Sequence, residues 1–435
     1  MTASNYDVIV IGSGISGLGL SALLSKAGKR VLTLEWAKNI GGRAHSFEFK
    51  GHITNIGGPR AGLEGRRVDE LFAKVGVEPG ERGFFEGVRT FRDGEFVSLQ
   101  DLAMRGNLEE AAKLMSMTKE LGESDDLAKY DAMTAQEWIE PLIKSPEVLD
   151  TARYSAIVMN TIPRLEDMAA SSLFEAMCII QSNPRIYLAA HGYGDFMQIL
   201  ADASIAKGGE VRTSSKVDEI LIEDGRVCGV LVNKEGGGER IEAPVVVAAL
   251  PVWELFDMAD KSLFPKDFAA KVEHLNRTTA IFGITVAVRE PLYDGKFFIL
   301  TDGKRCQHPI SAFMASNIAP AVAPEGEHLF EVCCQCAMEI GDDSDRLDEV
   351  VELLREDLEE MLPGWQDKVI WQKYYFHWEE PARTAGRAGV FRPDVKVPGV
   401  EGLYLTGDTV ASRSLPGLEC AADSAMMCAK AILEG

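Results

Sequence analysis

The first forty residues contain the feature that most restricts the fold of this chain. An apolar run over 6–11 predicts a buried strand, and the pattern Gly12-Ser13-Gly14-Ile15-Ser16-Gly17 follows it directly. A helical stretch continues to Gly28, and a second apolar run over 30–35 ends at Glu35. Strand, glycine turn, helix, strand and acid in this order predict a βαβ unit that binds a dinucleotide.

Each part of this motif has a physical role. Gly12 permits the tight turn, Gly14 lets the backbone approach a pyrophosphate, and Gly17 lets the helix pack close to the strand. The helix N-terminus offers unpaired N–H groups to the diphosphate, and Glu35 is placed to accept hydrogen bonds from ribose hydroxyls. We expect cofactor contacts along the turn and at the acid, from Gly12, Ser13, Gly14, Ile15, Ser16, Gly17, Glu35 and Trp36.

Two further glycine pairs follow the acid. Adjacent glycines let the backbone lie against a flat cofactor without Cβ collisions, and an arginine suits phosphate oxygens. The alternative for Arg43 is a solvated cation on a loop. The two segments contribute the candidate contacts Gly42, Arg43, Ala44, Gly57, Gly58, Pro59 and Arg60.

Matching segments occur in the middle and at the C-terminal end of the chain. Residues 402–408 indicate a strand that ends in the turn Gly407-Asp408, and a closing helix begins near Leu418. Residues 211–217 precede a strand, and the run 245–251 is another strand. The candidate contacts in these segments are Val217, Gly407, Asp408, Leu415, Pro416, Gly417 and Leu418.

In all these segments the sequence resembles the superfamily of flavin amine oxidases, protoporphyrinogen oxidases and phytoene desaturases. The resemblance implies FAD as the cofactor. In that superfamily Gly-Gly-Arg runs beside the diphosphate, a second glycine pair passes the flavin ring, and Gly-Asp meets the ribityl chain. It also implies that the backbone of Val217 meets the adenine. The N–H of Leu418 then points at the flavin pyrimidine oxygen, where the helix dipole favours negative charge.

Length and resemblance together predict the domain organisation. A chain of 435 residues exceeds one comfortable core. We expect an α/β fold in which a Rossmann-like FAD-binding domain is interleaved with a substrate domain of antiparallel sheet plus a helical lid. The FAD-binding domain takes residues 1–95, 195–255 and 385–435. The substrate domain takes 96–194 and 256–384, with the helical lid at 99–182.

Composition limits the partners. A net charge of −22 disfavours nucleic acid, since phosphate binding needs a cationic face. No apolar run reaches the length of a membrane-spanning helix, and no signal peptide is recognisable. We therefore expect a cytoplasmic protein with a small hydrophobic substrate and an unidentified electron acceptor. The sequence does not indicate the oligomeric state.

No metal site is expected. Cys333-Cys334-Gln335-Cys336 lies in a strand-like run, and no second ligand pair stands at zinc spacing. Cysteine used as a small apolar residue in a buried strand explains the run better. Methionines are frequent over 99–182, where they favour either a deformable lid over the substrate or ordinary core filling.

Departures from the amine oxidases indicate the reaction. The strand over 279–288 contains no lysine, and the stretch 415–418 contains no aromatic residue. Both are usual in flavin amine oxidases, whereas this ending is similar to the desaturase branch. We expect an FAD enzyme that desaturates or reduces carbon–carbon bonds of an alicyclic or isoprenoid-like substrate. An amine or amino-acid oxidase and a redox-neutral isomerase are the alternatives.

No side chain identifies itself as a catalytic residue, so the catalytic group stays unknown. His377 and Tyr374 are candidates to face the cavity, although alternate aromatics that fill a core explain their run equally well. Arg60 can bind a substrate oxygen or serve a phosphate. Hydride transfer to a flavin needs mainly position and a dry cavity, so a missing base does not exclude the reaction.

Overall fold

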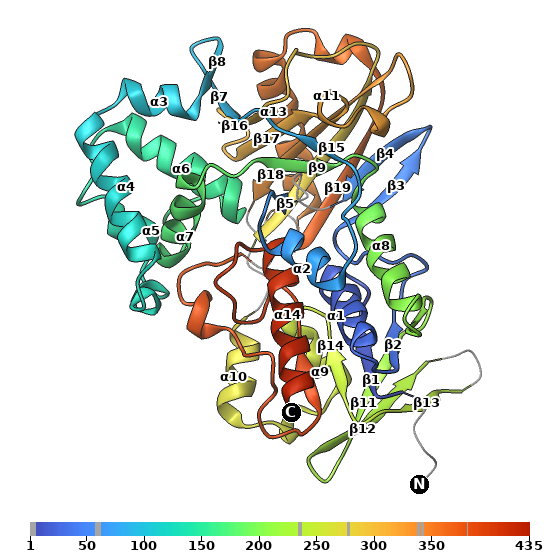
Figure 1. Ribbon diagram of the computed structural model, residues 1–435. Coiled ribbons are helices and arrows are strands. Elements are labelled where there is room, and N and C mark those ends of the chain that lie inside the picture. The colour runs from blue at the N-terminus through green and yellow to red at the C-terminus, as the bar shows by residue number, and fades with distance from the viewer. Residues whose placement is uncertain are drawn as a thin grey trace.

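The computed structural model describes residues 6–56, 62–233, 237–275, 279–336, 340, 343–380 and 382–435, without the side chains of 56, 336 and 377–380. Two sheets dominate the fold, one in the lower half and one in the upper half of Figure 1. The chain passes between them several times. The fold is therefore mixed α/β with a parallel Rossmann-like part and a separate, largely antiparallel part, which confirms the predicted class.

The lower sheet is parallel and has the strand order β10-β2-β1-β14-β20. Its central strands are continuous apolar runs that are buried on both faces, as parallel sheets require. The five strands are β1 (Val8–Ile11), β2 (Val31–Leu34), β10 (Glu210–Arg212), β14 (Val246–Ala248) and β20 (Leu403–Leu405).

Helices and a second small sheet cover this parallel sheet. Helix α1 (Ile15–Lys26) packs against α14 (Leu418–Glu434) and against α8 (Tyr193–Ile205). The antiparallel sheet of β11 (Val217–Glu223), β12 (Arg226–Val232) and β13 (Glu239–Glu242) shares one apolar core with β1, β14 and β20.

The upper sheet has seven strands in the order β19-β15-β18-β17-β16-β7-β8. All neighbours are antiparallel except β16 and β7, which are parallel. The strands are β7 (Val88–Arg92), β8 (Glu95–Ser98), β15 (Thr279–Val288), β16 (Phe298–Asp302), β17 (Pro309–Met314), β18 (His328–Cys336) and β19 (Val369–Glu380).

The two faces of this upper sheet differ. On β18, Phe330, Val332 and Cys334 join an outer core with helix α13 (Ser344–Met361). The alternate residue Leu329 joins a core with residues of the helical segment. Because side chains alternate along a strand, the odd-numbered residues of β18 face the middle of the molecule.

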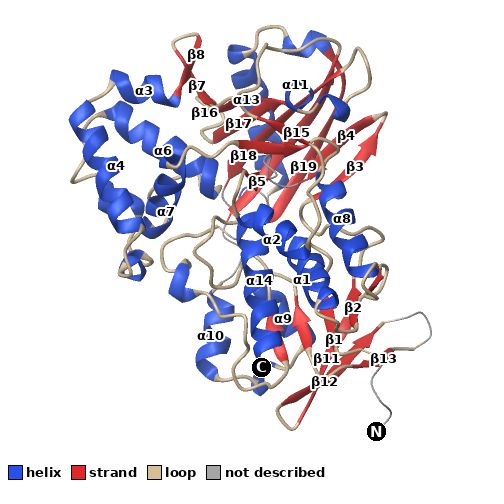
Figure 2. Cartoon of the chain, viewed as in Figure 1, coloured by secondary structure: helices blue, strands red, loops and turns tan. Residues whose placement is uncertain are grey.

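Residues 99–182 form helices with a core of their own, seen beside the upper sheet in Figure 2. Side-chain caps start three of these helices: Ser98, Asn107 and Thr134 each accept a backbone N–H. The helices are α3 (Leu99–Arg105), α4 (Leu108–Gly122), α5 (Ala135–Ile139), α6 (Pro146–Asn160) and α7 (Ala170–Gln181).

Short elements connect these parts. The hairpin β3 (His45–Phe49) and β4 (His52–Ile56) is followed by β5 (Gly62–Leu63), α2 (Arg67–Val75) and β6 (Arg82–Phe84). Strands β5 and β6 both pair with β9 (Ile186–Ala189). Helices α9 (Leu255–Met258), α10 (Lys266–His274) and α11 (Ala315–Ile318) complete the set.

Two of the expected domain boundaries do not match the sheets. Residues 88–95 were expected in the FAD-binding domain, but β7 and β8 extend the upper sheet through β16. Residues 256–275 were expected in the substrate domain, but Phe268 and Val272 of α10 are buried in the core of the parallel sheet. Each segment therefore belongs to the sheet against which its apolar side chains are buried.

A candidate FAD and substrate cavity

One long cavity of about 1280 Å³ connects the parallel sheet with the upper sheet. It begins at the carboxyl ends of β1 and β2, where open α/β sheets bind their ligands. Its volume exceeds the upper range of typical ligand pockets, roughly 1,000 Å³. It therefore has room for a dinucleotide and a second molecule.

The glycine turn fits a ligand that approaches the backbone. Gly12 has φ +104°, and a Cβ on it would lie 2.6 Å from the carbonyl oxygen of Ala249. A Cβ on Gly17 would lie 2.1 Å from the carbonyl oxygen of Gly12, so Gly17 serves helix packing and is not among the cavity residues. Gly14 has open space in front of it, with no atom within 4 Å of a Cβ position.

Glu35 lies at the end of β2, where its carboxylate is 3% exposed. One carboxylate oxygen accepts the Ser13 N–H at 2.9 Å and the Ser13 hydroxyl at 2.6 Å, and the other accepts the Ala37 N–H at 2.8 Å. The Glu35 carbonyl accepts the Ser215 N–H at 2.7 Å, which brings Val217 to the same end of the cavity. Trp36 also lines this end and is exposed.

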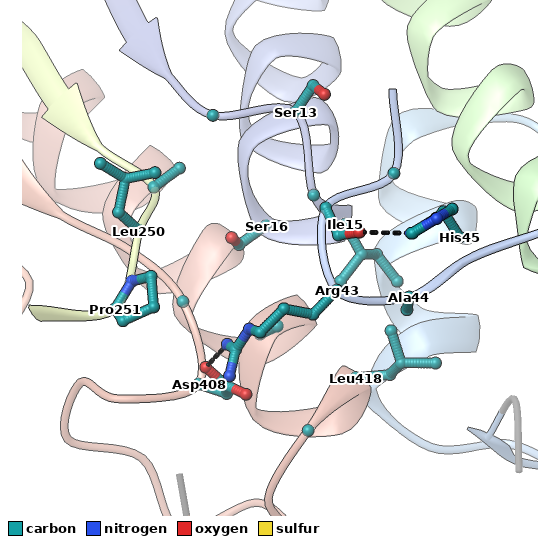
Figure 3. Close-up of a pocket in the computed structure, with 18 of the residues that line it drawn as sticks. Ser13, Ile15, Ser16, Arg43, Ala44, His45, Leu250, Pro251, Asp408 and Leu418 are labelled. Carbon is teal, nitrogen blue, oxygen red and sulfur yellow. Dashed lines mark hydrogen bonds and ion pairs between the residues drawn. The ribbon is translucent and has the colours of Figure 1, made fainter. Parts of the chain in front are cut away.

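Arg43 and Asp408 meet across the cavity, although they are far apart in the chain. Figure 3 shows the ion pair between the Arg43 guanidinium and the Asp408 carboxylate, the latter only 7% exposed. The alternative of a solvated loop cation for Arg43 is therefore wrong. The loop that carries Arg43 passes Gly14, since a Cβ on Gly42 would lie 3.2 Å from the Gly14 Cα.

Two buried arginines, which the sequence analysis did not identify, support this region. Arg392 donates to the carbonyl of Asp408 and to the carbonyl of Arg387, the latter at 2.9 Å. Burial, together with the charge of Arg383 nearby, lowers the pKa of Arg392 to about 10. Their only sequence signal is a basic stretch before the last strand, which resembles an ordinary solvated loop.

The C-terminal candidates divide into two groups. Gly407, Asp408, Pro416, Gly417 and Leu418 line the cavity, and α14 begins at Leu418 with its N-terminus toward the cavity (Figure 3). Leu415 differs, because it is buried in the core between the upper sheet and the helical segment and is not among the cavity residues. Gly57, Gly58, Pro59 and Arg60 lie outside the described residues.

The far end of the cavity is lined by apolar side chains from several elements. The charged residue that borders this end is Glu419 at the start of α14, whose carboxylate accepts the backbone N–H groups of Leu63 at 3.0 Å and Val68 at 3.2 Å. The charged residues that line the cavity come from the parallel-sheet part and the segments that complete it. The far-end residues are Leu63, Ile157, Val158, Thr161, Ile186, Tyr193, Phe298, Ser311 and Gln335.

The methionines of the helical segment do not form this lining. Met104 and Met115 are exposed, whereas Met168 and Met177 are buried in the segment's own core. The segment reaches the cavity only through the end of α6, at Ile157, Val158 and Thr161. The interpretation of the methionines as an adaptable lid surface is therefore wrong, and core filling explains the buried ones.

Tyr374, in the aromatic run on β19, does not face the cavity as one interpretation of the sequence suggested. Tyr374 pairs with Ile284 of the outer face, stacks on Phe282 at 5.9 Å and is 44% exposed, so it does not face the cavity. The side chain of His377 lies outside the described part. The ring of Tyr375 instead covers Gly283 on the inner face, with its hydroxyl 3.0 Å from the Cys333 Sγ.

Glu331 is a buried acid that sequence reasoning missed. It lies on β18, and the one hydrogen bond to its carboxylate from the described residues is the Asn55 N–H at 3.4 Å. Burial raises its pKa to about 8, and the N–H of Asn55 lowers it by less. The sequence pattern that could have identified it is a single acidic residue inside an otherwise apolar strand.

The described residues show neither a metal-binding group nor a membrane-spanning helix. They hold no group of three or more His, Cys, Asp or Glu placed to bind a metal. None of their helices is both long and apolar enough to cross a membrane.

The βαβ dinucleotide site and the antiparallel sheet share one long cavity, and the two parts of the chain that form them are interleaved. This arrangement is typical of oxidoreductases that use a dinucleotide cofactor. The chain belongs to the family of flavin-containing amine oxidoreductases, whose model matches residues 15–433. Its cofactor is FAD, and it is an FAD-dependent oxidoreductase.

The chain is similar to several known proteins. It is 24% identical to prolycopene isomerase 1 of an Oncidium hybrid cultivar, over 98% of this chain and 84% of that protein. It is 26% identical to human all-trans-retinol 13,14-reductase, over 58% of this chain and 48% of that protein. An oxidoreductase structure from Methanosarcina mazei shares the fold with a TM-score of 0.80 and 21% identity, over 98% of this chain and 100% of that one.

Proposed function

We propose that this chain desaturates or reduces a carbon–carbon bond of an uncharged, apolar substrate of alicyclic or isoprenoid type. The observation that carries the proposal is the far end of the cavity, where the described lining is mostly aliphatic and aromatic and holds no basic side chain. The acid that borders it, Glu419, already accepts the backbone N–H groups of Leu63 and Val68. A carboxylate placed there would lose its hydration without a cationic partner, and an ammonium would meet only a carboxylate that the backbone already uses. A neutral apolar molecule loses nothing by entering.

The same proposal assigns roles to the cofactor residues. Glu35 holds the adenosine ribose, the turn 12–16 and Arg43 hold the diphosphate, and Asp408 serves the ribityl chain. The start of α14 faces the flavin ring. The flavin supplies hydride exchange with a substrate carbon, while the protein positions the substrate and keeps the cavity dry.

The names of relatives support this substrate class. An isomerase of prolycopene and a reductase of retinol are both named for isoprenoid substrates. The match to the isomerase covers nearly the whole chain, which favours redox-neutral isomerisation as the second candidate function. The N–H groups at the start of α14 favour negative charge on the flavin in either reaction.

Anaerobic spectroscopy of the purified holoenzyme tests the proposal. Photochemically reduced enzyme is mixed with all-trans-retinol or with prolycopene, and flavin absorbance and products are followed together. Reoxidation with formation of a saturated bond supports reduction. A rearranged double bond without flavin reoxidation supports isomerisation. Rapid reduction of the oxidised enzyme by putrescine or benzylamine would replace the proposal with an amine oxidase.

Two variants separate a cavity effect from a general one. Val158→Arg places a charge in the far end of the cavity, and we expect it to abolish the substrate-dependent change while FAD stays bound. Leu108→Arg, on an exposed position of α4, is the matched control and should react as the unaltered enzyme does. Equal activities of the two variants would show that the substrate binds elsewhere.

A further inference from the structure

Polar side chains interrupt the apolar far end of the cavity, and two of them, Gln335 and Ser311, lie close together on the upper sheet. Gln335 lies on β18 and lines the cavity, although its residue surface is only 3% exposed. Its side-chain oxygen has no hydrogen-bond partner in the part of the chain that the structure describes. A buried acceptor without a donor is costly, and such groups in native proteins call for an explanation.

Ser311 is the second polar residue, and the register places it beside Gln335. On the neighbouring strand β17, Ser311 lies opposite Cys333, and Gln335 is two residues further along β18 on the same face. Such diagonal pairs lie close enough for both side chains to contact one molecule. Ser311 also lines the cavity, and the residue is only 2% exposed.

The chemistry of this pair selects a kind of ligand. A glutamine oxygen accepts a proton donor, whereas a serine hydroxyl and a glutamine NH₂ can donate. A ligand hydroxyl can donate to the Gln335 oxygen and accept from Ser311 at the same time. A ligand carbonyl or ether can only accept, which leaves the Gln335 oxygen without a partner, and a hydrocarbon satisfies neither residue.

The charge around the pair disfavours an ionic ligand group. The described far-end lining holds no base to pair with a carboxylate, and the acid that borders it, Glu419, already accepts two backbone N–H groups. We propose that the substrate of this enzyme is an isoprenoid-like alcohol whose hydroxyl is bound between Gln335 and Ser311. This inference rests on the proposed function, because it places that hydroxyl on the apolar substrate named there.

Three uncharged probes with a farnesyl-type hydrocarbon chain, which differ at one end, test the inference on the oxidised holoenzyme. They are farnesol, its methyl ether and β-farnesene, and binding is measured by isothermal titration and by perturbation of the flavin spectrum. We expect farnesol to bind roughly tenfold more tightly than the ether and the hydrocarbon, the worth of about one hydrogen bond to a buried group. Equal affinities of the three probes would overturn the inference and leave the proposed function standing.

Variants assign the preference to the two residues. Gln335→Met keeps the length of the side chain without its polar atoms, and Ser311→Ala removes the hydroxyl. Each should lower the affinity for farnesol roughly tenfold and leave the affinity for β-farnesene unchanged. Gln198→Met, on an exposed position of α8, is the control and should keep the preference. The ratio of FAD to protein verifies that each variant holds its cofactor.

Two other results would overturn the inference. A shift of the flavin midpoint potential by Gln335→Met, with the preference for farnesol retained, would show that the amide serves the cofactor. Binding of none of the three probes to the holoenzyme would remove the proposed function together with the inference.

Discussion

At the scale of single residues, Glu331 departs most from the ordinary behaviour of its side chain. Its carboxyl is buried on the inner face of β18, and the burial raises its pKa to about 8 from an ordinary 4.5. In the folded protein it is therefore mainly protonated at neutral pH, whereas in the unfolded chain it is ionised. The difference makes stability depend on pH.

The sign of this dependence follows from proton binding. Between about pH 4.5 and pH 8 the folded state holds a proton that the unfolded state has lost, so the free energy of unfolding falls as pH rises. At roughly 1.4 kcal/mol per unit, the group costs on the order of 3–5 kcal/mol of stability by pH 8. We expect Glu331→Gln to remove this loss, so the variant gains stability at pH 8 relative to the unaltered protein and not at pH 4.5.

Denaturant unfolding of both proteins at about pH 4.5 and about pH 8 measures the effect. Glu48→Gln, an exposed acid on β3, is the control and should leave the pH dependence unchanged. Parallel curves for Glu331→Gln and the unaltered protein would mean that Glu331 has an ordinary pKa.

Glu35 carries a second residue-scale prediction. We expect Glu35→Ala to weaken FAD binding by about 1.5–3 kcal/mol, the worth of hydrogen bonds to a charged group. Its carboxylate also holds the N–H groups of Ser13 and Ala37, so the turn loses support as well. Flavin fluorescence on dilution measures the affinity, with Glu48→Gln as the exposed control. An unchanged affinity would remove Glu35 from the ribose site.

At the scale of elements, buried ion pairs fasten the helical segment to the segment between β19 and α14. Glu175 of α7 accepts from Arg383 at 2.8 Å, with both side chains almost fully buried. Asp131, also buried, accepts from Arg413 at 2.8 Å. Helix α7 and its neighbours are thus held against the two segments that flank β20, one with Arg392 and the other with Asp408.

Removing one partner of the buried pair should be strongly destabilising. We expect Glu175→Gln to cost about 3–5 kcal/mol of unfolding free energy, because Arg383 then stays buried without its counter-charge. Asp7→Asn, which breaks an exposed pair with Arg30 of 2.7 Å, should cost at most about 1 kcal/mol. Urea unfolding compares the two variants, and equal losses would contradict a tight buried pair.

At the scale of the whole molecule, the cavity determines how the cofactor is held. The described residues that line it include no cysteine, and Cys420 is buried with its Sγ 3.5 Å from the Asp408 carbonyl. We expect one FAD per chain, bound without a covalent link. Acid precipitation should release all yellow colour into the supernatant, and colour in the pellet would contradict the expectation.

The sequence predicted the parts of the molecule that depend on local patterns. The turn after β1, the acid at the end of β2 and the helix at Leu418 are each specified by neighbouring residues, and the structure shows them at one cavity. That residues 279–288 contain no lysine can be read from the sequence without the structure.

The parts that failed depend on pairing between distant segments. Strands β7 and β8 join the upper sheet by a parallel contact with β16, and no local pattern in 88–98 indicates that partner. Ser311 and Gln335 become neighbours only through the register of β17 and β18. The burial of Arg383 and Arg392 likewise depends on the helical segment and on the loop of Asp408, which the sequence does not place.

The strand order of the parallel sheet has a consequence for how the protein is made. Strand β14 ends at Ala248, but β20, which flanks it in the sheet, begins only at Leu403 and is therefore synthesised much later. Translation proceeds at roughly 5–20 residues per second, so the nascent chain carries an open sheet edge at β14 for several seconds. Asp408 and α14 emerge after β20. The FAD site is therefore incomplete until α14 has been synthesised, and we expect cofactor loading to follow that step.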